Sequence, residues 1–157
     1  MTATKVIGES VKQTNRTFIK SYVNDYADAI TENYRRYHII TLNWNLHGNY
    51  PEYAREQLDA IENGTANLMK FKVYTGKRYY KIVQQEFETW EGSRNYGKYA
   101  DGSVHCFVDK ETGDVYKPAS WSAPAKHIRF TFQNVDHLKF LLNPDNVGWA
   151  GGYLYIR

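Results

Sequence analysis

The side chains with the strongest nucleophilic and acid–base chemistry in this chain are Cys106 and its neighbour His105. A cysteine beside a histidine can act as a nucleophile with its base. Both residues fall in residues 104–108, an apolar run that predicts a strand, and successive side chains of a strand point to opposite faces. We therefore expect the two side chains to be separated, with Cys106 a buried structural cysteine.

The other candidate chemical groups lack the spacing that their chemistry needs. Glu86 and Glu88 share one strand face, but paired carboxylates catalyse proton transfer only within a cleft. Residues 109–114 resemble the start of a calcium loop without its closing glutamate, so we expect them to form a turn, in which Gly113 supplies the positive φ of a tight hairpin. The histidines are not spaced as metal ligands; they are His38, His47, His105, His127 and His137. We expect no catalytic residue, no metal and no cofactor, and predict that the protein is not an enzyme.

The clearest chemical pattern interleaves basic and aromatic residues. Residues 68–85 contain five Lys or Arg and no acid, and residues 115–135 contain three and no acid. Cations can neutralise phosphates, while aromatic rings can stack on bases or fill a protein interface. A solvated strand face with lysines that prevent edge pairing is the alternative. The candidate binding surface comprises Lys70, Lys72, Tyr74, Lys77, Arg78, Tyr80, Lys81, Trp121 and Lys126.

Two helices must lie ahead of this basic segment, within residues 14–64. Apolar residues recur at three- and four-residue steps from Phe18 to Tyr37, which predicts a helix that begins near residue 14 and fades near His38. A second helix begins at Pro51 and ends at Gly64. Residues 1–13 are polar and aperiodic, and we expect them to form a flexible arm.

The hydrophobic period changes to two residues after Gly64, which predicts strands. Residues 79–87 are predicted to form one of these strands. The sequence leaves two orientations open, with either Tyr80 and Ile82 or Tyr79 and Val83 facing the core. The expected strands cover residues 69–74, 79–87, 104–108, 115–117, 128–132 and 153–156, with a short helix at 135–142. The sequence therefore predicts a single α+β domain over residues 1–157, with two N-terminal helices packed on a mostly antiparallel five- to six-stranded sheet and residues 68–157 mainly β.

The composition indicates in which cellular compartment the protein occurs. The 157 residues carry a net charge of +3 and one cysteine, which excludes an internal disulfide and indicates a reducing cytoplasm. The N-terminus lacks the pattern of a signal peptide. The apolar runs are far shorter than the roughly 18 residues that a spanning helix needs. We expect a cytoplasmic protein with no membrane partner.

Residues 104–126 resemble a stretch found in small uncharacterised proteins of tailed bacteriophages. There, Phe-Val-Asp leads through Thr-Gly-Asp to Lys-x-Ala-Ser-Trp and Pro-Ala-Lys, matched here by residues 107–109, 112–114, 117–121 and 124–126. A strand with tyrosine, lysine and isoleucine often precedes it, here residues 80–82. The resemblance covers roughly residues 70–130 and implies a phage origin. It implies no activity, cofactor or catalytic residue.

Three functions follow as hypotheses. The first is a phage-encoded, non-catalytic binding module that docks on a host or phage macromolecule, foremost a protein, in the host cytoplasm. The second is binding of single-stranded nucleic acid through the basic–aromatic hairpin. The third is a role as a component of the virion or of its assembly. The sequence determines neither the partner nor the oligomeric state.

Overall fold

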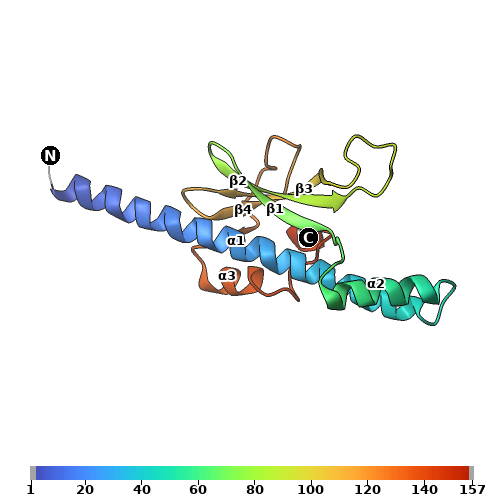
Figure 1. Ribbon diagram of the computed structural model, residues 1–157. Helices are drawn as coiled ribbons and strands as arrows, with labels where there is room; N and C mark the ends of the chain where they lie inside the picture. The colour runs from blue at the N-terminus through green and yellow to red at the C-terminus, as the bar shows by residue number, and fades with distance from the viewer. Residues whose placement is uncertain (1–2, 156–157) are drawn as a thin grey trace.

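The computed structural model describes the backbone of residues 3–155 and the side chains of residues 16–155. A long helix, α1 (Ala3–Asn45), runs below a sheet, and α2 (Pro51–Asn63) returns beside its C-terminal end (Figure 1). The later elements are β1 (Lys70–Thr75), β2 (Tyr79–Phe87), β3 (Tyr99–Asp109), β4 (Asp114–Tyr116), β5 (Phe130–Thr131), α3 (Val135–Leu141) and the 3-10 helix η1 (Gly152–Leu154). This architecture confirms the predicted α+β class.

The strands form a five-stranded antiparallel sheet in the order β1-β2-β3-β4-β5. Its register places one row of residues side by side across four strands. Tyr74 pairs with Lys81, Lys81 with Phe107, and Phe107 with Tyr116. Paired residues share a face of the sheet, so these side chains form a row on one face, which we call the outer face.

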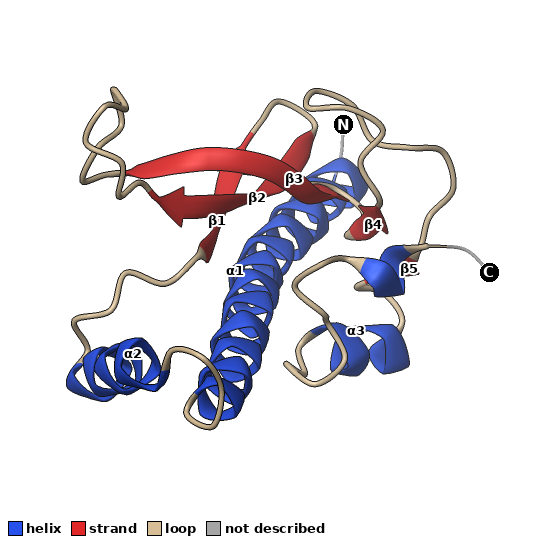
Figure 2. Cartoon of the chain, turned by 90° about the vertical axis from the view of Figure 1, so that its right-hand side faces the viewer, coloured by secondary structure: helices blue, strands red, loops and turns tan. Residues whose placement is uncertain are grey.

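The core lies between the other face of the sheet, the inner face, and α1. Val23, Tyr26 and Ile30 of α1 are fully buried in one cluster with Ile82 and Val108 of the sheet. Figure 2 shows the sheet lying across α1, with α2 and α3 on either side of that helix. Within the described part of the chain, no helix covers the outer face (Figure 2). Loops rather than helices therefore lie against the outer face.

α1 is longer than predicted at both ends. Residues 3–13, which we expected to form a flexible arm, are helical, because a helix that has nucleated gains one hydrogen bond for each further residue. The helix also continues beyond His38 through the β-branched residues 39–41 to Asn45. The penalty of β-branching is below about 1 kcal/mol per residue, and the burial of Leu42 offsets it.

The prediction of a strand at residues 153–156 is wrong for its described residues, and the sheet has five strands. Residues 153–155 lie in η1 or directly after it, and residue 156 lies outside the described residues. The strand predicted at residues 128–132 shortens to Phe130–Thr131. The reason is Arg129, whose guanidinium donates hydrogen bonds to the carbonyls of Leu154 at 2.6 Å and His127 at 2.8 Å. These bonds hold the preceding residues in a loop.

The β3–β4 turn forms as the sequence predicts. The carboxylate of Asp109 accepts hydrogen bonds from the backbone N–H groups of Glu111 at 2.8 Å and Thr112 at 3.1 Å. Gly113 follows with a φ of +75°, a conformation that favours glycine. A Cβ atom at this position would lie 2.9 Å from the Cβ atom of Phe132.

Replacing Gly113 by alanine is expected to lower the free energy of unfolding by about 2 kcal/mol, because the new methyl group meets both the unfavourable φ and Phe132. Gly64→Ala is the matched control. Gly64 has a φ of +74°, but a Cβ there has no neighbour within 4 Å. Urea unfolding should show a loss of about 1 kcal/mol for the control. An equal loss in the two variants would contradict a role for the Phe132 contact.

Candidate functional site

A groove of about 460 Å³ crosses the outer face beside the β1–β2 turn. Tyr74, Lys81 and Phe107 of the cross-strand row form its floor. One rim consists of the turn residues 75–78, and the other carries Trp121 from the long β4–β5 loop. We call this feature the outer groove.

Trp121 and Lys81 meet in the middle of the outer groove. The Lys81 ammonium lies 3.9 Å from the centroid of the Trp121 ring and donates a hydrogen bond to the Trp121 carbonyl at 3.1 Å. A turn shapes the loop: Pro118 and Pro124 form an isolated bridge, and the N–H of Ala119 donates to the carbonyl of Ala123. The Trp121 residue is still 46% exposed, so it remains accessible to a ligand.

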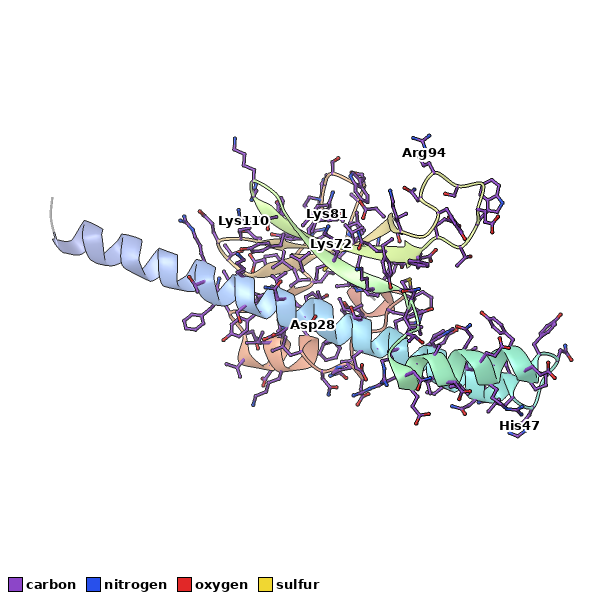
Figure 3. All side chains as sticks on the ribbon, in the orientation of Figure 1. Asp28, His47, Lys72, Lys81, Arg94 and Lys110 are labelled. Atoms are coloured by element: carbon purple, nitrogen blue, oxygen red, sulfur yellow. The ribbon has the colours of Figure 1, made fainter. Side chains whose placement is uncertain are left out.

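Further cations lie over aromatic rings around the outer groove. Arg78 lies 5.2 Å from the ring centroid of Tyr79, and Lys72 lies 4.8 Å from that of Tyr74. Figure 3 shows Lys72 and Lys81 over the sheet on the side away from α1. Contacts of this kind contribute only about 0.5–1 kcal/mol at exposed positions. An anion that binds Lys72 more strongly can therefore displace its ring, whereas Arg78 also pairs with Asp109, whose Oδ2 lies 3.7 Å from its Nε.

Asp101 is the one acid among the described residues that line the outer groove. Its Oδ1 accepts a hydrogen bond from Gln85 Nε2 at 2.7 Å. The Tyr74 hydroxyl donates to Oδ1 at 2.8 Å and to Oδ2 at 2.9 Å. The hydrogen bond from Gln85 is the main cause that lowers the pKa of Asp101, and the charges of Lys72 and Lys81 act in the same direction. The carboxylate is therefore ionised and oriented.

The structure gathers most of the predicted binding residues at one place. Those that line the outer groove are Tyr74, Lys77, Arg78, Lys81 and Trp121. Lys70 and Lys72 occupy exposed positions of β1, and Lys126 is exposed in the β4–β5 loop. Lys81, from the basic window of residues 68–85, thus contacts Trp121, from the basic window of residues 115–135, at the groove.

Tyr80 does not belong to this surface. It is 5% exposed and is part of the core cluster on the inner face. Its neighbours Tyr79 and Lys81 point outward instead. The sequence did not determine which face of β2 points to the core, because apolar residues occur on both faces of this strand. For the same reason Tyr79 was not among the predicted binding residues. Asp101 was not among them because the next strand was expected to begin only at residue 104.

On the inner face, a β-bulge brings His105 and Cys106 to the same side of the sheet. Cys106 pairs with Ile82 and Val104 pairs with Val83, so His105 is an extra residue in β3. The prediction that the two side chains lie on opposite faces is therefore wrong. The prediction that Cys106 is buried is confirmed.

A buried hydrogen-bond network links these two side chains through two tyrosines. The hydroxyls of Tyr26 and Tyr153 lie 2.5 Å apart, and the Tyr153 hydroxyl lies 2.7 Å from Nε2 of His105. The Cys106 thiol bonds to the Tyr26 hydroxyl, and the His105 ring bonds to the Trp149 backbone.

Burial keeps the two ends of this network uncharged. It lowers the pKa of His105 to about 4 and raises the pKa of Cys106 to about 12. At neutral pH the pair is a thiol and a neutral imidazole, whereas a nucleophilic cysteine needs a lowered pKa. We interpret the network as part of the core. Among residues 16–155, no group of three His, Cys, Asp or Glu side chains is placed to hold a metal ion.

The fold and the groove define a small α+β protein with a basic and aromatic groove on one face of its sheet. The chain belongs to a family of unknown function, DUF7717, which it matches over residues 6–156. Comparison with curated proteins and with solved structures finds no match. Among the described residues, no helix combines the length and the apolar character that crossing a membrane requires.

Proposed function

We propose that the protein is a non-catalytic module that binds single-stranded nucleic acid through the outer groove. The observation that carries this proposal is the Lys81–Trp121 contact, which unites a cation and an exposed ring inside one open groove. Surfaces that bind single strands combine cations along the phosphates with rings on which bases stack. By analogy, sheets that bind RNA also present aromatic residues on an open face.

The energies favour a base on the Trp121 ring over the lysine that occupies it. Stacking of one base contributes about 1–3 kcal/mol, while an exposed cation–ring contact contributes about 0.5–1 kcal/mol. A base can therefore displace the Lys81 ammonium, which is then free to pair with a phosphate. Lys77 and Arg78, both exposed on the rim, supply two further cations for the strand.

The content of lysine favours nucleic acid over a protein partner. Protein interfaces are enriched in aromatic residues and arginine but depleted in lysine. The outer groove and its edge present Lys72, Lys77 and Lys81 together. A host or phage protein, the partner that the sequence alone favoured, is therefore the competing proposal for this surface.

The proposal includes a phage origin and action in the host cytoplasm. Its support is the resemblance of residues 104–126 to a stretch of tailed-phage proteins. A component of the virion is the alternative, and mass spectrometry of purified particles distinguishes the two. Detection of the chain in particles would contradict a purely cytoplasmic role.

The salt dependence of binding tests the proposal. Fluorescence anisotropy would follow a labelled single-stranded oligonucleotide of about 12 nucleotides. Neutralisation of three phosphates by Lys77, Arg78 and Lys81 corresponds to a slope of about −2 in log K against log salt concentration. We therefore expect the affinity to fall about twentyfold between about 50 and 200 mM salt. Absence of binding at low salt would overturn the proposal.

Two tryptophan variants locate the binding surface in the same assay. Trp121→Ala is expected to weaken binding about tenfold, because one stacked base is lost. The slope against salt should stay unchanged, since no cation is removed. Trp44→Ala is the matched control, because Trp44 is 72% exposed and lies in α1 near the α2 end of the molecule. Equal losses in the two variants would place the strand elsewhere.

A further inference from the structure

The acid in the outer groove has no evident use in holding phosphates. Asp101 is exposed and shares the groove with Lys81 and Trp121. A carboxylate repels a phosphate chain, and an ionised carboxylate only accepts hydrogen bonds. The favourable contacts that it can offer a nucleic acid are therefore with hydrogen-bond donors, which along a DNA strand are the N–H groups of the bases.

The carboxylate is held in place for such a contact. Gln85 is buried and donates to Oδ1, while the Tyr74 hydroxyl donates to both oxygens. A carboxylate has about four lone-pair positions. Gln85 occupies one position on Oδ1, and the single proton of the Tyr74 hydroxyl is shared between the two oxygens, so Oδ2 keeps a position for a ligand. Asp101 is thus an oriented acceptor with room for a further donor.

Bases differ in what they present to an acceptor of this kind. Cytosine, adenine and guanine carry an exocyclic amino group, and carboxylates accept hydrogen bonds from N4 of cytosine. Uracil and thymine carry the O4 carbonyl at the same place, and two oxygens without a hydrogen between them repel each other. Their N3–H donor lies between the O2 and O4 carbonyls, which repel the second oxygen of a carboxylate that approaches it. Cytosine and uracil rings have the same size, so stacking on Trp121 does not separate them.

We propose that Asp101 makes the outer groove prefer bases with an exocyclic amino group, so that among pyrimidines it selects cytosine over uracil and thymine. The base stacks on Trp121, its amino group donates to Oδ2 of Asp101, and the rim cations hold the flanking phosphates. This inference rests on the proposed function, since it assigns base selection to the same groove.

The test compares oligo(dC) with oligo(dU) of equal length at one salt concentration, at slightly alkaline pH so that cytosine stays unprotonated. The wild-type chain should bind oligo(dC) about fivefold to tenfold more tightly, the discrimination expected of one good hydrogen bond to a base. Equal affinities for the two strands, with a steep dependence on salt, would overturn the role of Asp101 and leave the proposed function standing. Failure to bind either strand would overturn both.

Asp101→Asn supplies the sharper test. The donors from Tyr74 and Gln85 hold the asparagine oxygen inward, so the amide nitrogen faces the base and donates to a carbonyl. We expect the preference for cytosine to disappear or to reverse in favour of uracil. A preference for cytosine that persists in this variant would overturn the assignment.

Asp59→Asn is the control for the change in charge. Asp59 is exposed on α2, which lies beside α1 and apart from the outer face (Figure 1). This variant should keep the wild-type preference. The comparison of the two strands on the wild-type chain needs no substitution, so the inference stays testable even where Asp101→Asn fails to fold.

Discussion

Replacing Tyr26 by alanine is expected to lower the free energy of unfolding by about 3–5 kcal/mol, the range for removing a large buried ring. Tyr26 is fully buried between α1 and the sheet, and its ring lies 6.2 Å from that of Phe132 in a T-shaped arrangement. The alanine variant leaves a cavity beneath β3 and removes the hydroxyl that Tyr153 and Cys106 contact.

Two further variants separate the causes in the same urea unfolding experiment. Tyr26→Phe keeps the ring and removes only the hydroxyl, so we expect a loss of about 1–2 kcal/mol, since a buried partner is left without its hydrogen bond. Tyr53→Ala, at an exposed position of α2, should change the stability by less than about 0.5 kcal/mol. A Tyr26→Ala variant as stable as the Tyr53→Ala variant would contradict this account of the core.

Acid is expected to destabilise the fold through His105. The pKa of this imidazole falls from 6.5 to about 4 on burial. Below pH 6.5 the unfolded chain binds a proton that the folded chain does not, so stability is complete above this pH and is lost as the pH falls toward 4. The loss over this window is about 3 kcal/mol. His38, whose pKa burial also lowers, adds to it in the same direction.

Chemical denaturation at a series of pH values measures this effect. His105→Gln cannot take up the proton, so its stability should depend less on pH between about 6.5 and 4. His47→Gln is the control, since His47 is exposed at the tip of the α1–α2 hairpin (Figure 3). It should keep the wild-type dependence. A wild-type stability that does not change across this window would show that His105 is not held neutral by the fold.

The sequence by itself determined the order and the kind of most elements. The change of hydrophobic period after Gly64 separates helices from strands, and period is a local property of the chain. Residues that act within a few positions were also readable, such as Pro51 at the start of α2 and Gly113 in the β3–β4 turn. The basic window of residues 68–85 was readable for the same reason, and it lies on the β1–β2 hairpin that borders the outer groove.

Only the tertiary structure decided which of these side chains meet. Lys81 and Trp121 are 40 positions apart, and Tyr74 and Asp101 are 27 positions apart. Both contacts depend on the register of the sheet, and a shift of one residue moves a side chain to the other face. The bulge at His105 shows the same dependence, because one extra residue in β3 overrode the alternation that the sequence predicted. The groove is thus a product of strand pairing, which distant parts of the chain set together.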